Sequence, residues 1–241
     1  MPLLFACNDF SYELVERRYK IEKGKETLIK EIFWEDFDKK IKSKEVEYKP
    51  SINATYIDIY SDSLLTKSYM IDNYEGVDTF NILNYRHDEL GNIIEYIEIT
   101  DDKEIVTKCD LTLDSTTLKP TSIVCYSSEG EKYIVENVYY VDRKVSRTFV
   151  EDSLIFNSIT YFNQDKQKIG RFRNYLSFSQ PMTDSSFFEY VNGNLMRETK
   201  YFNDTLSGFK NYFYKNDTLV KIISNYSGKD SSTVVVKYFK N

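Results

Sequence analysis

The hydrophobic and polar positions of this chain form short alternating runs from Tyr12 to the C-terminus. Runs of seven to nine residues are separated by polar segments, a spacing typical of antiparallel strands rather than of helix–strand units. The pattern predicts an all-β fold, a large antiparallel β-meander of about twelve strands that forms a curled open sheet or half-barrel. The predicted turns are Glu22–Gly24, Asp88–Asn92, Asp101–Lys103, Ser127–Gly130, Asn163–Asp165 and Ser227–Asp230.

Residues 25–44 fit two structures. A strand pair with its turn at Asp36–Lys39 explains how Lys39-Lys-Ile-Lys-Ser43 restarts after a break. A helix explains the same stretch, because four apolar residues would share one helical face, namely Ile29, Phe33, Phe37 and Ile41. The hairpin is the favoured interpretation, and the helix is the alternative.

A short phrase, Tyr-x-(Asn/Asp)-x-x-(Leu/Val), occurs four times in the second half of the chain. Each copy ends a strand on Tyr, turns on residues that tolerate left-handed backbone, and restarts on an aliphatic residue. The phrase therefore predicts a hairpin at each copy. The copies are Tyr140–Val145, Tyr190–Leu195, Tyr201–Leu206 and Tyr214–Leu219.

The last quarter of the chain suggests a strand register. Pairing Phe202 with Leu206 sets Glu198 opposite Lys210, and this charge pair supports the register. Continuing it sets Phe213 opposite Leu219. Both faces of such a sheet are partly apolar, so we expect curling, or a second layer of strands, a helix or a ligand.

Two cysteines lie on another predicted hairpin. Strands at Glu104–Leu113 and Thr121–Ser127 set Cys109 opposite Cys125. A cross-strand disulfide would suit an oxidising compartment. The alternative is a pair of buried thiols that pack as small apolar groups. The thiols are favoured, because a slip of one residue in register would separate the pair.

Composition and charge narrow the class of protein. The chain has 241 residues with 21 Tyr, 16 Phe, eight Gly and four Pro, which suits pleated sheets. A net charge of −6 argues against nucleic-acid binding, which depends on clustered Lys and Arg. No Pro/Gly/Ser linker divides the chain, so residues 8–241 are predicted to form a single β-meander domain.

The N-terminus resembles the lipobox of bacterial lipoproteins, in which a cysteine is lipidated after cleavage. Leu4-Phe-Ala-Cys7 has an aliphatic residue three places before Cys7 and a small residue directly before it. The resemblance implies that residues 1–7 are the remnant of a signal segment and that Cys7 is a lipid anchor. Six residues without Lys or Arg precede Cys7, so we expect the true start to lie upstream. The alternative is a short apolar N-terminus with a free thiol.

Residues 140–241 resemble the MORN-type repeats of bacterial secreted proteins and lipoproteins. In those repeats an aromatic residue, an Asn-Gly turn and a Leu recur at a fixed spacing; here Tyr190 and Tyr214 are 24 residues apart. Gly170 and Gly208 precede aromatic strands, as glycines do in such repeats. The resemblance implies a ribbon of β-hairpins that serves as a scaffold or binding surface, with no catalytic residues to transfer.

The sequence contains few residues or motifs that would support catalysis or cofactor binding. His87 is the only histidine, which excludes sites with several histidines. There is no glycine-rich phosphate loop, nucleophile elbow or Cys-x-x-Cys. We therefore expect no enzyme activity, cofactor or metal. The strongest candidates for a binding surface are aromatic: Tyr190, Tyr201, Tyr212, Tyr214 and Tyr226.

The sequence leads to one hypothesis and one alternative. The hypothesis is a lipid-anchored protein of a bacterial cell envelope, in the outer membrane or periplasm, that binds or scaffolds a protein, glycan or lipid partner. The alternative is a periplasmic carrier that holds a lipid or other apolar ligand within a curled sheet, because both faces carry apolar residues. No apolar run approaches the roughly 18 residues of a membrane-spanning helix.

Overall fold

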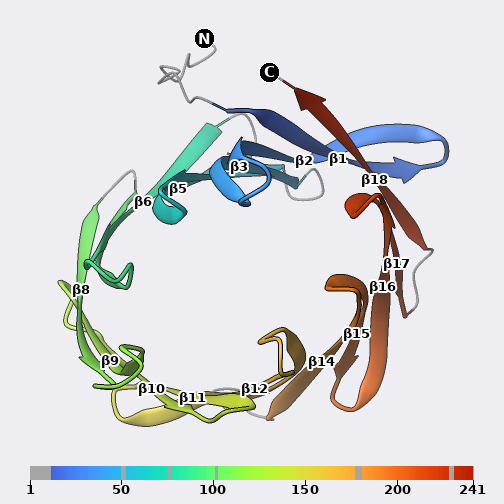
Figure 1. Ribbon diagram of the computed structural model, residues 1–241. Coiled ribbons are helices and arrows are strands. Elements are labelled where there is room, and N and C mark those ends of the chain that lie inside the picture. Colours follow the sequence, from blue (N-terminus) through green and yellow to red (C-terminus); the bar gives the residue numbers. More distant parts are fainter. Residues whose placement is uncertain are drawn as a thin grey trace. The chain divides into compact units, whose positions relative to one another are not determined.

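The computed structural model describes residues 12–49, 53–74, 77–100, 103–176, 181–227 and 231–240, and all regular elements in these ranges are strands (Figure 1). The first nine strands are β1 (Leu14–Glu22), β2 (Lys25–Asp36), β3 (Ile41–Lys49), β4 (Ala54–Ser61), β5 (Leu64–Tyr74), β6 (Val77–His87), β7 (Ile93–Ile99), β8 (Glu104–Leu113) and β9 (Pro120–Ser127). The other nine are β10 (Lys132–Tyr139), β11 (Arg143–Val150), β12 (Ser153–Phe162), β13 (Lys168–Tyr175), β14 (Met182–Val191), β15 (Asn194–Phe202), β16 (Thr205–Lys215), β17 (Thr218–Tyr226) and β18 (Ser232–Lys240). No helix in the described part of the chain is long and apolar enough to cross a membrane.

The predicted antiparallel meander is confirmed, because strands adjacent in sequence pair antiparallel along the sheet. The prediction of an open sheet or half-barrel is wrong. β1 pairs with β18 as well as with β2, so the 18-stranded sheet closes on itself in its hydrogen bonding as a β-barrel. Closure satisfies the backbone groups that an open edge would leave unpaired. The expectation of about twelve strands was too low, because several strands are joined by very short turns.

The chain forms two compact units. The first contains the described residues up to Asn92, with Tyr96–Glu104 and those from Val235 onward; the second contains Ile93–Glu95 and Ile105–Val234. We refer to them as unit 1 and unit 2 and describe each by itself. In unit 1, β2 and β3 confirm the hairpin interpretation of residues 25–44.

Three copies of the repeated phrase form two-residue turns with left-handed backbone at both positions. The φ angles are 49° and 81° at Asn192-Gly193, 44° and 59° at Asn203-Asp204, and 50° and 58° at Asn216-Asp217. Such turns match the twist of paired strands. The copy at Tyr140 differs, since three residues separate β10 from β11. All four predicted hairpins are present.

The predicted register in the last quarter is correct at one pair and shifted near the turns. Glu198 lies opposite Lys210, as expected. Leu206 lies opposite Tyr201 rather than Phe202, and Leu219 lies opposite Tyr214 rather than Phe213. A register shift beside each pair supplies the difference, because a β-bulge places one extra residue in one strand.

The remaining predicted turns agree with the structure where it describes them. The turns at Glu22–Gly24, Asp88–Asn92, Ser127–Gly130 and Asn163–Asp165 each join two strands. Residues 101–102 and 228–230, which belong to the other two predicted turns, lie outside the described residues.

Unit 1 contains a small apolar core. Leu14, Ile32 and Trp34 are buried together, and Phe37 and Tyr238 pack against them. The Phe37 ring meets Trp34 and Tyr238 edge-on, with centroids 5.7 and 5.5 Å apart, a favoured aromatic geometry. The cluster thereby joins the β2–β3 turn to β18.

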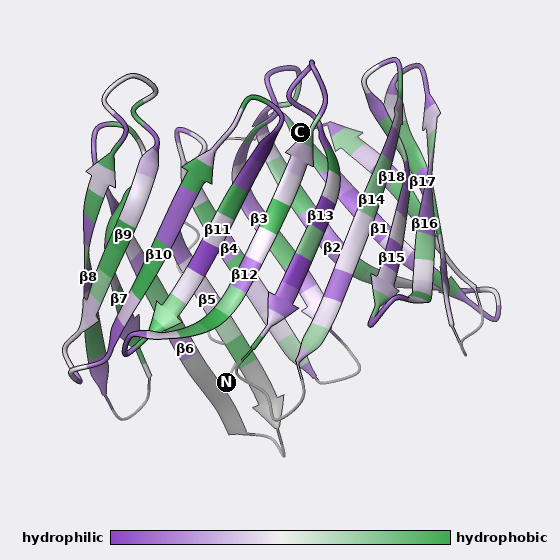
Figure 2. Ribbon diagram, turned by 90° about the horizontal axis from the view of Figure 1, so that it is seen from below, coloured by the Kyte–Doolittle hydropathy of each residue, from purple (hydrophilic) through white to green (hydrophobic). Residues whose placement is uncertain are grey.

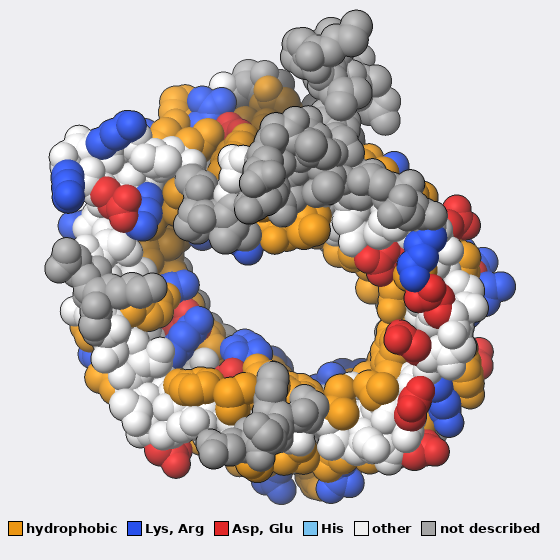
Figure 3. Space-filling model, turned by 180° about the vertical axis from the view of Figure 1, so that it is seen from behind, with side chains coloured by type: hydrophobic (Ala, Val, Ile, Leu, Met, Phe, Trp, Pro, Cys, Tyr) orange, Lys and Arg blue, Asp and Glu red, His pale blue; other side chains and the backbone are white. Residues whose placement is uncertain are grey.

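Hydrophilic and hydrophobic residues are mixed along the strands (Figure 2), and β10 and β11 each contain neighbouring residues of the same kind. Successive side chains of a strand point to opposite faces. On the side drawn in Figure 3, acidic and basic side chains are interspersed among hydrophobic ones.

Candidate functional site

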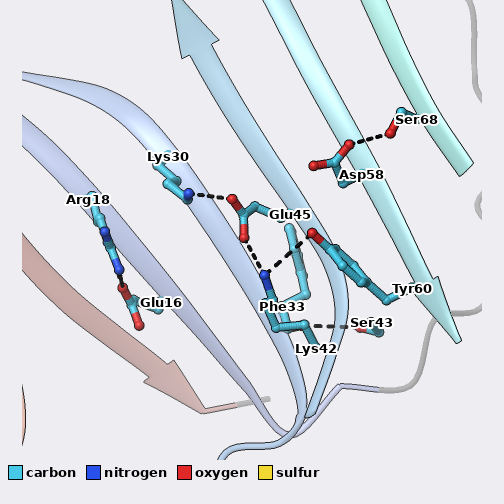
Figure 4. Close-up of polar contacts among 10 residues, drawn as sticks. All are labelled: Glu16, Arg18, Lys30, Phe33, Lys42, Ser43, Glu45, Asp58, Tyr60 and Ser68. Atoms are coloured by element: carbon cyan, nitrogen blue, oxygen red, sulfur yellow. Dashed lines mark hydrogen bonds and ion pairs between the residues drawn. The ribbon is translucent and has the colours of Figure 1, made fainter. Parts of the chain in front are cut away.

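Unit 1 carries a band of charged side chains on one face of β1 to β4 (Figure 4). Arg18 lies opposite Lys30 in the register, and Glu45 lies opposite Asp58. Like charges therefore lie directly opposite each other in these pairs, and acids meet bases diagonally, as Lys30 meets Glu45. We call this band the ion-pair face; its members are Glu16, Arg18, Lys30, Glu45 and Asp58.

Each acid of the ion-pair face has a partner. Arg18 Nη2 lies 2.7 Å from Glu16 Oε1, and Asp58 accepts a 2.6 Å hydrogen bond from Ser68 Oγ. Lys30 and Lys42 both contact the Glu45 carboxylate, with Lys42 Nζ 2.7 Å from Glu45 Oε2 (Figure 4). Within this band no described carboxylate is left for a cationic ligand.

The pKa of Glu45 shows the strength of this pairing. Burial alone would raise the pKa of the Glu45 carboxyl, but the hydrogen bonds from Lys30 and Lys42 hold the pKa below its ordinary value. In turn, Glu45 raises the pKa of Lys42 despite the burial of that ammonium group. Groups that fix each other in their charged forms stabilise a fold and leave little free charge for binding.

A second polar cluster lies around Glu31 in unit 1. Arg17 Nε donates to Glu31 Oε1 at 2.8 Å, and the Tyr48 hydroxyl donates to Glu31 Oε2 at 2.7 Å. Burial and the neighbouring carboxylate raise the pKa of Tyr48. Both oxygens of the Glu31 carboxylate therefore have partners within the cluster.

Unit 2 has a charged face with an excess of cations. Arg173 Nε donates to Asp184 Oδ1 at 2.7 Å, and Glu198 lies 3.3 Å from Lys200 Nζ. Arg171 and Lys168 lie on the same face without an ion pair among the described residues, and Arg171 Nε is buried without a hydrogen-bond partner there. Burial and the charge of Arg171 lower the pKa of Lys168.

The five predicted tyrosines do not share one surface. Tyr201 is in register with Ser185 on one face, whereas the alternation places the other four on the charged face with Glu198 and Lys200. Tyr212 donates a 3.2 Å hydrogen bond to Glu198 Oε2, and Tyr214 donates one of 3.0 Å to the Leu195 carbonyl. Burial raises the pKa of Tyr190 and Tyr226. All five are half-buried.

The opposite face of unit 2 carries a row of aromatic rings. The centroids of Tyr161, Phe172, Phe187 and Tyr201 follow one another at 5.9, 5.5 and 5.9 Å, each pair edge to face. The row crosses β12 to β15, and we call it the aromatic row. Only Tyr201 of this row was among the predicted residues. The other three were missed because each ring comes from a different strand and they meet only through the register.

A pocket of about 250 Å³ lies at the ends of β10 to β13 in unit 2. Its lining combines aromatic rings with cations, chiefly Lys119, Tyr139, Tyr140, Arg143, Lys144 and Phe162. Burial and the charge of Lys119 lower the pKa of Lys144. This pocket was not predicted from the sequence, because its cations come from three separate segments.

Cys109 and Cys125 are opposite each other, as the predicted register requires. They form a disulfide, with Cα atoms 4.1 Å apart, so the favoured interpretation as two thiols is wrong. Both residues are buried. Cys7 lies outside the described residues, and its lipidation stays a prediction.

His87 ends β6. Among the described residues no set of three or more His, Cys, Asp or Glu could hold a metal ion.

Comparison with known proteins gave structural similarities, two of which are described here, and no sequence match. No protein-family model and no curated protein matches the chain. A porin-like protein from Bacteroides uniformis aligns with a TM-score of 0.46 at 9% identity, covering 95% of this chain and 96% of that one. A porin-like protein from Bacteroides vulgatus aligns with a TM-score of 0.43 at 9% identity, covering 92% of this chain and 97% of that one.

Proposed function

We propose that this protein is a non-catalytic binding module of a bacterial cell envelope, and that the aromatic row is its binding surface. The observation that carries the proposal is the exposure of the row: Phe172 is 41% exposed and Phe187 is 39% exposed, side by side on neighbouring strands. Large aromatic side chains left in contact with solvent as a group are typical of binding surfaces.

The neighbours of the row suit a glycan. Ser185 lies opposite Phe172 and Thr199 lies opposite Phe187 in the register, so hydroxyl groups alternate with the rings. Asn174, next to Phe172 on the sheet, has an exposed amide that donates to Asn157 Oδ1 at 3.0 Å. Apolar ring surface for the C–H face of a sugar, with amides and hydroxyls for its OH groups, is the complementary chemistry.

Two features support the envelope as the location. The Cys109–Cys125 disulfide suits an oxidising compartment outside the cytoplasm. The lipobox-like Leu4-Phe-Ala-Cys7 supports anchoring of the chain through a lipid on Cys7. The MORN-like phrases of residues 140–241 agree with a scaffold of hairpins that presents a surface.

Sedimentation with insoluble envelope polysaccharide tests the binding role. We expect the protein to sediment with the polysaccharide, and we expect the double variant Phe172→Ala/Phe187→Ala to lose at least tenfold in affinity. Phe213→Ala is the matched control, because Phe213 is 42% exposed on the same unit but lies outside the row. Equal binding by the double variant and the control, with circular dichroism unchanged, would reject the aromatic row as the binding surface.

Fractionation tests the anchor separately. In the chain expressed from its natural start, we expect Cys7→Ser to move the protein from the membrane fraction to the soluble fraction and to abolish labelling by a fatty-acid probe. An unchanged distribution and an unchanged label would remove the lipid anchor from the proposal and leave the glycan surface standing.

A carrier of lipid or another apolar ligand has less support. Hydrocarbon held against the ion-pair face in unit 1 or the charged face in unit 2 would lie beside charged groups, and burying charged groups beside hydrocarbon is unfavourable. Native mass spectrometry of protein purified from an envelope extract distinguishes the two functions. A co-purifying mass of lipid size would favour the carrier.

A further inference from the structure

We propose that the pocket at the ends of β10 to β13 binds a small carboxylate that carries an aromatic or apolar body. This site is separate from the aromatic row and does not depend on the glycan-binding role. The proposal rests on three features of the pocket: the arrangement of its cations, the lack of acids to pair with them, and its size.

Two lysines approach one tyrosine ring in the pocket. Lys119 Nζ lies 5.2 Å from the Tyr139 ring centroid, and Lys144 Nζ lies 5.3 Å from it. The Tyr139 hydroxyl donates to the Pro120 carbonyl at 3.2 Å, which holds the ring in place near both ammonium groups. A single ammonium suffices for a cation–π contact, and a second one adds repulsion. An anion between the two lysines would remove that repulsion.

The cations of the pocket outnumber its acids. Arg143 pairs with Asp142 at 3.6 Å, and Lys166 Nζ donates to the Val141 carbonyl at 3.2 Å. Across the described ranges, neither Lys119 nor Lys144 has a carboxylate at ion-pair distance. In unit 1, by contrast, the acids of the ion-pair face are all matched. A chain with a net charge of −6 thus keeps an uncompensated cationic site here.

The size and the walls of the pocket define the rest of the ligand. Its volume of about 250 Å³ lies below the roughly 300–1,000 Å³ of pockets for drug-sized ligands. Tyr140, Phe162 and Val141 supply apolar wall beside the lysines. The site therefore suits an aromatic or short-chain acid, or the acidic end of a longer molecule, better than a bare inorganic anion.

Calorimetric titration of the full chain with four probes tests the charge and the body of the ligand separately. Benzoate should bind saturably. Benzamide, which has the same shape without the charge, should bind at least tenfold more weakly, and so should acetate and inorganic phosphate, which lack the ring. Equal binding of benzoate and benzamide, or no saturable binding of benzoate, would overturn the proposal.

Variants locate the site and separate binding from folding. Lys144→Gln and Lys119→Gln should each weaken benzoate binding at least tenfold, with an unfolding midpoint equal to or above that of the wild type, because each removes one of two like charges. Lys221→Gln is the control, since Lys221 also lies over an aromatic ring, 5.7 Å from Phe213, but outside the pocket. It should leave the affinity unchanged.

The variant data can also contradict the proposal. Unchanged affinity in both pocket variants would overturn it, and so would a clear drop in their unfolding midpoints, which would mark the lysines as structural. Phe172→Ala/Phe187→Ala should bind benzoate normally, so failure of the glycan surface and failure of this pocket are distinguishable.

Discussion

At the residue scale, the backbone of the turns shows what local sequence can and cannot predict. Asn192-Gly193, Asn203-Asp204 and Asn216-Asp217 were predictable because these residues tolerate left-handed backbone. The hairpin Tyr60–Leu65 repeats the same pattern, with Tyr60 opposite Leu65, but was missed. In its turn, Ser63 has a φ angle of 68°. Ser seldom adopts a positive φ angle, so the residue type alone does not predict this turn.

Ser63 offers a direct test of this strain. We expect Ser63→Gly to raise the free energy of unfolding by about 0.5–1 kcal/mol, because glycine adopts positive φ without steric cost. Gly193→Ala is the reciprocal change at φ 81° and should lower it by a similar amount. Urea denaturation measures both. A decrease for Ser63→Gly would show that the serine side chain contributes more than its backbone costs.

The Glu45 carboxylate predicts a dependence of stability on pH. Its pKa in the folded chain lies below the ordinary value of 4.5, which the carboxyl has in the unfolded chain. The unfolded chain therefore binds the proton more readily, so Glu45 stabilises the fold above pH 4.5 and loses this contribution as the pH falls through its folded pKa.

Urea denaturation of wild type and Glu45→Gln between neutral and acidic pH tests this contribution. The difference in unfolding free energy between the two proteins should be largest at neutral pH and should shrink below about pH 4.5. A difference that stays constant down to acidic pH would show that Glu45 acts by packing instead of by its charge.

At the element scale, the β-bulges explain why the predicted register was right at Glu198–Lys210 and wrong next to the turns. Charge pairing identifies two opposite residues, but an extra residue in one strand has no signature in the sequence. The sequence therefore could not predict which two residues pair next to each turn, such as Tyr201 and Leu206, and only the structure shows them. The aromatic row and the cationic pocket were missed for the same reason, since both depend on register across several strands.

Two glycines of the MORN-like pattern have different roles. A Cβ at Gly208 would lie 2.3 Å from the Asn225 carbonyl oxygen and 2.9 Å from Tyr226 Cα, whereas at Gly170 the nearest atom, on Tyr161, is 3.8 Å away. We expect Gly208→Ala to lower the unfolding free energy by about 1–3 kcal/mol, since the β16–β17 pair must separate locally.

Gly170→Ala is the matched control for Gly208→Ala. Its Cβ would make ordinary van der Waals contact, so we expect a change within about 0.5 kcal/mol. Thermal denaturation of the two variants compares them directly. Equal effects would mean that the close approach at Gly208 is not what requires a glycine there.

At the scale of the whole molecule, the sequence predicted the all-β meander but not its closure. Alternation and turn residues act over a few positions, so they identify strands and hairpins. The pairing of β1 with β18 joins the two ends of the described chain, and no local pattern encodes a contact at that separation. Composition and charge were enough to exclude some classes of function. The disulfide and the pocket could be identified only in the structure.

Removal of β18 tests the importance of closure. We expect a chain that ends before Ser232 to aggregate, because β1 and β17 would each present unpaired backbone groups. Size-exclusion chromatography should show large species or no soluble protein. Lys240→Ala, at the end of the same strand, is the control and should elute as the wild type does. A soluble truncated protein of unchanged elution would show that the sheet tolerates an open edge.

The pairing of β1 with β18 also sets an order of events during synthesis. The first strand emerges early, yet one side of it finds its partner only when the last residues of the chain have been made. Contacts between such distant segments form slowly, and an unpaired strand that waits is prone to join another chain. We therefore expect the pairing of β1 with β18 to be the final step of folding. Until that step is complete, the cell must prevent the unpaired strands from associating with other copies of the protein.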